Sequence, residues 1–67
     1  MSSSIITSSI TCLATGERTV EVVTDGRVGA EAEAFERAGE LFSADPFLSF
    51  RKNDSGELRF YFTDRLI

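Results

Sequence analysis

Residues 47–63, FLSFRKNDSGELRFYFT, decide the fold of this 67-residue chain. Apolar residues alternate with polar ones on both sides of residues 53–56, whose residue types favour a turn. In a strand, this alternation places every second side chain on the same face. The stretch therefore predicts a β-hairpin with one apolar, largely aromatic face.

The turn residues set the register of this hairpin. A three-residue loop ending at Gly56, with Gly56 in the left-handed region, is one of the common hairpin connections. This loop places Phe50 opposite Phe60. It also places Leu48 opposite Phe62, so that the apolar side chains pack together across the strands.

A second hairpin is predicted on the N-terminal side, with its turn at Gly16. Residues 5–14 and 18–24 alternate in the manner of half-buried strands. The side chains expected on the inner face are Ile6, Ile10, Cys12, Ala14, Val20 and Val22. One three-residue loop pairs Ile10 with Val20, and another pairs Ile10 with Val22. Both keep the apolar faces matched, so the sequence leaves the register open.

Between the hairpins, residues 28–43 show the spacing of an amphipathic helix. The residues expected to form its apolar face are Val28, Ala32, Phe35, Ala38, Leu41 and Phe42. Thr24 or Asp25 is expected to cap the start of the helix. Pro46 ends it, because proline disfavours the helical conformation in the preceding residue.

The element order is strand, strand, helix, strand, strand, which predicts an α+β domain of the ββαββ type. A four-stranded antiparallel sheet with the helix packed on one face buries both apolar surfaces at once. Residues 1–67 form one domain, with residues 1–4 expected to fray. The order of the two hairpins in the sheet is left open.

The charge is acidic and unevenly distributed. The formal net charge is −4, with eight acids and three bases in residues 1–46, and three acids and four bases in residues 47–67. Nucleic-acid binders usually have the opposite balance, since Lys and Arg contact the phosphates. Direct binding of nucleic acid is therefore not expected.

The side chains that most often carry catalysis are missing. The chain has no His, no CxxC pair and no phosphate-binding glycine loop, so we expect neither an enzyme nor a metal or cofactor site. The single cysteine, Cys12, is expected to be buried and inert among apolar neighbours. Neither a membrane-spanning run nor a secretory signal is apparent, which favours the cytoplasm.

An acidic ridge on the predicted helix is the main candidate for partner binding. Its core is Glu33, Glu36 and Glu40, which share the solvent side of the helix, with Glu33 and Arg37 as a favourable pair. Two further acids belong to the candidate site: Glu31, on the apolar side, and Asp45, before Pro46. The ridge has two interpretations, either an ordinary solvated helix face or a surface that meets a basic groove on a partner.

A secondary candidate surface lies on the outer face of the C-terminal hairpin. The predicted register places Arg51 opposite Arg59 and next to Tyr61. Because like charges facing one another are unfavourable, Glu57 or Glu21 is expected to neutralise them, or an acidic partner to bind there. Phe47 falls on the same face, where with Tyr61, Leu66 and Ile67 it is a possible patch for self-association.

A compact acidic domain of two hairpins and one helix, without catalytic groups, resembles the small phage-encoded inhibitors of the anti-CRISPR type. The resemblance covers the whole chain and involves no shared motif. It implies a nucleic-acid mimic that binds the basic surface of a CRISPR effector subunit in the bacterial cytoplasm. The acids of the ridge, with Glu31 and Asp45, would then stand in for phosphates.

Two other functions fit the same residues. The first is a small homo-oligomeric structural or assembly protein, which would use an edge strand and the patch around Phe47. The second is an acidic antitoxin or regulatory subunit, which would share the electrostatics of the inhibitor.

Overall fold

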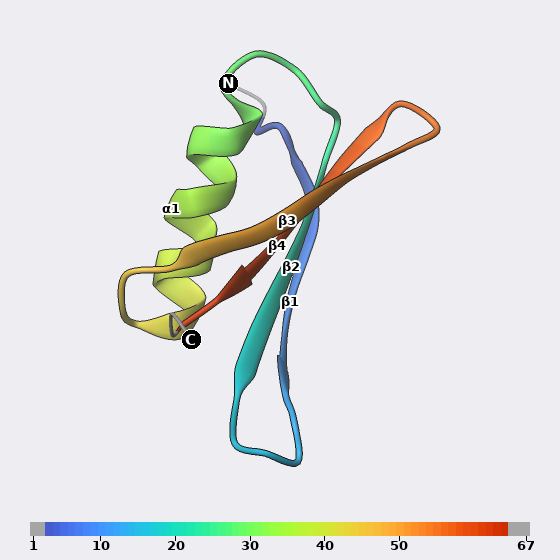
Figure 1. The fold of residues 1–67 in the computed structure, drawn as a ribbon. Coiled ribbons are helices and arrows are strands. Elements are labelled where there is room, and N and C mark those ends of the chain that lie inside the picture. Colours follow the sequence, from blue (N-terminus) through green and yellow to red (C-terminus); the bar gives the residue numbers. More distant parts are fainter. Residues whose placement is uncertain (1–2, 65–67) are drawn as a thin grey trace.

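The computed structural model describes residues 3–64, which form a four-stranded antiparallel sheet and one helix. The elements are β1 (Ile5–Cys12), β2 (Arg18–Thr24), α1 (Ala30–Phe42), β3 (Phe47–Asp54) and β4 (Glu57–Thr63). Figure 1 shows the helix on one side of a twisted sheet, with the two hairpin loops projecting at opposite ends. The predicted α+β fold of ββαββ type is confirmed.

The two hairpins lie side by side, joined through their second strands. The strand order is β1-β2-β4-β3, and β2 pairs with β4 in antiparallel fashion. Val20 lies opposite Phe62, and Val22 lies opposite Phe60. The inner strands therefore bring the valine pair of one hairpin against the aromatic pair of the other, an arrangement that the sequence had left open.

The core lies between these inner strands and the helix. Phe62 meets the half-buried Phe35 of α1 edge-to-face, with ring centroids 4.9 Å apart and planes at 74°. Burying a side chain of this size stabilises the fold by about 1.5–3 kcal/mol. The fully buried apolar residues of the cluster are Val20, Val22, Ala30, Ala34, Ala38, Phe42, Phe60 and Phe62.

The helix packs on the sheet through Phe35, Ala38, Leu41 and Phe42, as predicted, but the first half of its apolar face differs from the prediction. Its buried residues recur every fourth position and, except for Phe42, are alanines, which allow the backbone to approach the sheet closely. Ala32 is exposed, and Val28 precedes the helix with its side chain in solvent. The prediction for these two residues was wrong because counting Val28 as helical rotated the apolar arc toward Ala32.

Glycine begins the helix in place of the predicted cap. Gly29 occupies the N-cap position with φ 90°, a left-handed conformation that favours glycine. Thr24 instead donates to the carbonyl of Leu58, at 2.8 Å, and Asp25 accepts from the main-chain N–H of Arg27, at 3.1 Å. Both candidate cap residues therefore order the connection between β2 and α1 and lie outside the helix.

The first hairpin adopts one of the two predicted registers. Ile10 pairs with Val20, and the Leu13 N–H donates to the carbonyl of Glu17 at 2.7 Å. Gly16 has φ 90°, as expected for the last residue of a three-residue loop. The register that pairs Ile10 with Val20 is confirmed, and the alternative is excluded.

Strand β1 contributes less to the core than predicted. A register shift between Ile5 and Thr7 turns Ile5 toward the core and leaves Ile6 53% exposed. Ile10 is 39% exposed, and Cys12 is also exposed. The predicted burial of these side chains was wrong, because β1 lies at the edge of the described sheet.

The second hairpin has a tighter turn than predicted. Ser55 and Gly56 form a two-residue connection with φ 51° and 83°, and Asp54 pairs with Glu57. The shorter loop moves the register by one residue, so that Phe50 lies opposite Tyr61 on the outer face. Phe50 was wrongly predicted to face Phe60.

A bulge then restores the predicted register at the other end of β3. The shift falls between Leu48 and Phe50, so that Ser49 is the extra residue and Leu48 pairs with Phe62 as expected. Phe50 is 56% exposed as a result.

Within residues 3–64, no helix has the length and apolar character needed to cross a membrane.

Candidate binding surfaces

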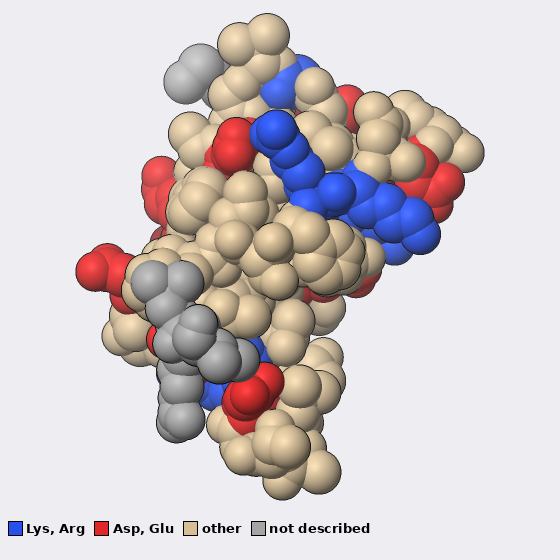
Figure 2. All heavy atoms as spheres, viewed as in Figure 1, with Lys and Arg blue, Asp and Glu red and all other residues tan. Residues whose placement is uncertain are grey.

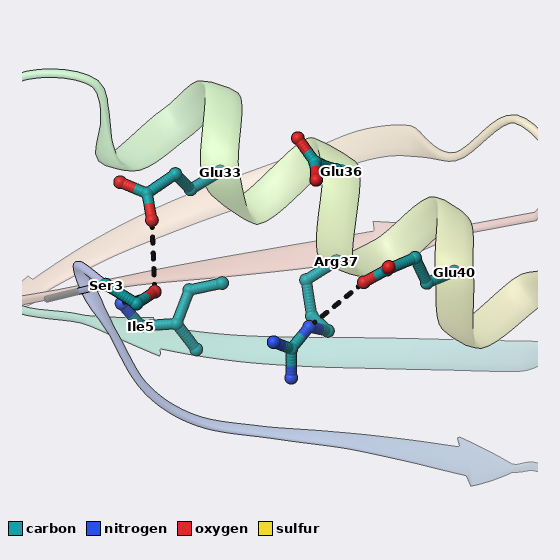
Figure 3. Close-up of a pocket in the computed structure, with 6 residues that line it drawn as sticks. All are labelled: Ser3, Ile5, Glu33, Glu36, Arg37 and Glu40. Carbon is teal, nitrogen blue, oxygen red and sulfur yellow. Dashed lines mark hydrogen bonds and ion pairs between the residues drawn. The ribbon is translucent and has the colours of Figure 1, made fainter. Parts of the chain in front are cut away.

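The predicted acidic ridge borders a shallow hollow between α1 and the start of β1. The hollow has a volume of about 130 Å³ and is lined by Ser3, Ile5, Glu33, Glu36, Arg37 and Glu40. In Figure 3 the two acids Glu33 and Glu40 lie on the side of the helix that faces Ser3, Ile5 and β1, whereas Glu36 points away from β1. The three acids of the ridge are therefore brought together, as the sequence predicted, although each has a different environment.

Glu33 is a half-buried anchor between the helix and the first residues of the chain. Its Oε1 atom accepts from the Ser3 hydroxyl at 3.0 Å and from the Ser4 main-chain N–H at 3.2 Å. Hydrogen bonds from Ser4 and Ser3 hold the pKa of Glu33 below its ordinary value. Its carboxylate is thus fixed in position and ionised, and Ser4, within the segment expected to fray, is buried.

Arg37 links Glu40 of the helix to β1. Its Nε atom lies 3.3 Å from Glu40, and its Nη1 atom donates to the Ser8 hydroxyl at 3.4 Å. The arginine side chain accordingly points toward β1 (Figure 3). Arg37 is paired with Glu40 one turn further along, whereas the sequence had suggested Glu33. Glu36 is exposed to solvent.

The two outlying acids do not join this group. Glu31 forms an ion pair with Arg51 of β3, with Oε2 and Nη1 3.4 Å apart. Asp45 is exposed in the connection between α1 and β3. Figure 2 shows Lys and Arg atoms gathered over β3, with Asp and Glu atoms dispersed around them. The candidate acidic site is therefore reduced to the ridge of Glu33, Glu36 and Glu40.

The secondary candidate surface is also changed by the tight turn. Arg51 lies opposite Phe60 on the helix side of the sheet. Lys52 lies opposite Arg59, at the position predicted for Arg51. Two cations still face one another, so the expected need for an anion remains. Arg59 lies 3.3 Å from Glu57 and 3.6 Å from Glu21, which supply the predicted neutralisation.

An aromatic pair adjoins these charges on the outer face. Phe50 stacks on Tyr61 with ring centroids 4.4 Å apart and planes at 19°. The Tyr61 hydroxyl donates to Glu21 at 2.8 Å, and this hydrogen bond raises the pKa of the phenol. Sequence reasoning missed Phe50 because its alternation with Leu48 suggested a common face.

Phe47 pairs with Thr63 on the outer face and is half-buried, in agreement with its predicted side of the sheet. Leu66 and Ile67, the other apolar members of the predicted patch, lie outside the described residues. The structure thus places Phe47 and Tyr61 on one face without defining that patch. The aromatic pair of Phe50 and Tyr61 is the apolar feature of this surface that it does define.

Neither a metal-binding cluster in the described part of the chain nor a known relative identifies the chemistry of these surfaces. Among residues 3–64, no group of three or more His, Cys, Asp and Glu side chains is placed to hold a metal ion. Comparisons with family models, with curated proteins and with solved structures gave no significant match. The candidate surfaces must therefore be judged on their own geometry.

Proposed function

We propose that this protein is a non-enzymatic binding module whose ridge of Glu33, Glu36 and Glu40 occupies a basic surface on another protein. The surfaces that nucleic-acid-handling proteins offer to phosphates are partners of this kind. An inhibitor of the anti-CRISPR type, acting on an effector subunit in the bacterial cytoplasm, is the specific role we favour. An antitoxin or regulatory subunit would use the same ridge.

The observation that supports the proposal is the fixed carboxylate of Glu33. Ser3 and Ser4 hold it by two hydrogen bonds, which also lower its pKa. A glutamate that is already immobilised avoids up to about 2 kcal/mol of side-chain entropy loss when a partner binds. Glu36 and Glu40 extend the negative surface along the same helix edge, where they would steer a basic partner.

Charge reversal at the two exposed positions tests the proposal without removing the anchor. In the variant Glu36→Lys/Glu40→Lys, Glu33 and its hydrogen bonds are retained. The matched control is Glu17→Lys/Asp54→Lys, which changes the net charge equally on the two hairpins. Each protein is immobilised and exposed to bacterial lysate, and bound proteins are identified with and without double-stranded DNA as competitor.

The proposal predicts a basic nucleic-acid-binding protein that is captured by the wild type and by the control. Capture is lost in Glu36→Lys/Glu40→Lys and reduced by the competing DNA, because the DNA occupies the same basic surface. Equal capture by all three proteins, or indifference to the DNA, would show that the ridge is only a solvated helix face. Circular dichroism confirms that each variant is folded.

A further inference from the structure

The two edges of the sheet differ in how well they are protected from pairing with another strand. Within residues 3–64, β1 and β3 are the outer strands. Edge strands usually carry charges or bulges that discourage further pairing. Strand β3 has both, with Arg51, Lys52 and Asp54 and the bulge at Ser49. The β1 sequence, IITSSITC, has no charged residue and no proline, and its bulge at Ile6 lies outside the regular stretch from Thr7 to Cys12.

Exposed apolar side chains are concentrated along the unprotected edge. Ile6, Ile10 and Leu13 are 53%, 39% and 45% exposed. They are three of the five large apolar residues exposed among residues 3–64, the others being Val28 and Phe50. Single exposed apolar residues are common, but their gathering on an uncharged edge indicates a contact surface.

The hydrogen bonds of the first hairpin show which main-chain groups face this edge. The Leu13 N–H donates to Glu17, and its carbonyl accepts from Gly16, so both groups point toward β2. In an antiparallel pair, this direction alternates along the strand. The pairing of β1 with β2 is regular from Thr7 to Cys12. The N–H and C=O groups of Ser8, Ile10 and Cys12 therefore point away from β2.

We propose that this edge binds β1 of a second copy of the same chain. The two strands run antiparallel about a twofold axis perpendicular to the sheet, which joins two sheets and leaves both helices on one face. The twofold axis can pass beside Ser9 or beside Ile10. In either register, the outward main-chain N–H and C=O groups of Ser8 and Ile10 form hydrogen bonds to the second copy. This inference does not depend on the proposed function.

A second copy is the favoured occupant because β1 is compatible with itself. An uncharged strand has no like-charge opposition when it pairs with its own copy, whereas β3 would place Arg51, Lys52 and Asp54 near identical charges. Self-pairing also gives the exposed side chains of Ile6 and Ile10 neighbours on the opposing strand. An extended segment of another protein would satisfy the same main-chain groups, but it would leave the purified protein monomeric.

The dimer is expected to be weak and to strengthen with salt. A single pair of strands buries an area at or below the small end of specific interfaces, about 1,200 Å² or less, so we expect a dissociation constant of about 10–1,000 μM. Each copy carries a net charge of −4, and salt screens the repulsion between them. Binding of the acidic ridge to a basic partner would show the opposite salt dependence.

The test combines sedimentation with amide exchange on the full chain. Sedimentation velocity from about 10 μM to about 1 mM should show a monomer–dimer equilibrium. Hydrogen exchange followed by NMR should show the amides of Ser8 and Ile10 slowing as concentration rises. The amides of Ser9 and Thr11 point toward β2 and should be protected at all concentrations.

Two matched variants locate the contact. Ser9→Lys adds a charge to β1 and should weaken association about fivefold at low salt. Ser49→Lys adds the same charge to an exposed serine of the other edge strand, so it changes the net charge equally and is the reference against which the weakening in Ser9→Lys is measured. Far-UV circular dichroism checks that both variants fold.

Two results would overturn the proposal. One is a monomer throughout the concentration range, which would leave the edge to a segment of another protein or to none. The other is a dimer in which the Ser8 and Ile10 amides stay fast or which Ser9→Lys leaves intact. In either case the ridge experiment could still succeed, because it depends on the helix carboxylates and not on the main-chain groups of the β1 edge.

Discussion

Exchanging Phe50 and Phe60 for alanine, one at a time, tests whether the tight turn and the bulge are correct. Phe60 is fully buried in the core, whereas Phe50 is 56% exposed and contacts Tyr61 through ring stacking. Removing a buried phenylalanine costs about 3–5 kcal/mol. Loss of an exposed aromatic stack costs about 0.5–1.5 kcal/mol. The two variants should therefore differ by at least about 1.5 kcal/mol.

The assay is urea unfolding followed by far-UV circular dichroism at fixed temperature. A domain of 67 residues has a total stability of about 3–10 kcal/mol, so Phe60→Ala is expected to be partly or wholly unfolded without urea. The milder Phe60→Leu, with an expected loss of about 1–1.5 kcal/mol, supplies a complete transition for comparison. If Phe50→Ala destabilised the domain as much as Phe60→Ala, the three-residue loop would be right and the bulge wrong.

Three further predictions concern polar contacts and glycines. The pKa of Glu33 is lowered in the fold, so its contribution to stability is present above the unfolded pKa and lost as pH falls through the folded one. Thermal melts from about pH 6 to about pH 2 should accordingly converge for wild type and Glu33→Gln in acid, and a constant gap would refute this. Gly39→Ala should stabilise the helix by about 0.5–1 kcal/mol, because an added Cβ meets only ordinary contacts there, whereas Gly56→Ala at φ 83° should cost about 1–2 kcal/mol in the same urea assay. A gain in both glycine variants would contradict the turn geometry. The hydrogen bond to Glu21 raises the pKa of Tyr61, so Tyr61 should ionise at higher pH than a free tyrosine in a titration followed by ultraviolet absorbance. Glu21→Gln should shift the midpoint of this titration down, and an unchanged midpoint would rule out the contact.

The element order was predictable because each element has its own periodicity. Residues 58–63 alternate cleanly, and residues 30–42 repeat their apolar side chains every three or four positions. The first turn was narrowed to two registers, since Gly16 marks it and both faces had to match. Periodicity therefore identifies the strand and helix segments and the approximate positions of the turns.

The errors arose where the backbone departs from a regular repeat. The bulges at Ile6 and Ser49 insert one residue each, and alternation beyond such a point continues in the sequence while changing face in the structure. Burial of Ile10 and Cys12 depended on whether β1 lies inside the sheet or at its edge, which follows from long-range pairing. Local patterns contain no information about that pairing.

The candidate site was predicted only in part, again because local spacing does not contain long-range contacts. The ridge of Glu33, Glu36 and Glu40 followed from helical spacing, but the contact of Glu33 with Ser3 and Ser4 joins parts of the chain far apart in sequence. Lys52, and not Arg51 as predicted, lies opposite Arg59 because the loop is one residue shorter than predicted. Side-chain spacing identified the helix edge, and tertiary pairing determined its partners.

The central pairing of β2 with β4 also has a kinetic consequence. Each hairpin contains only local contacts and can form within microseconds. The step that joins them must close the long loop carrying α1, because Val20 meets Phe62 near the other end of the chain. This high contact order should make assembly of the two inner strands, together with docking of the helix, the rate-limiting event of folding. Substitutions in Val22 or Phe60 should then slow folding, whereas changes at either turn should mainly alter unfolding.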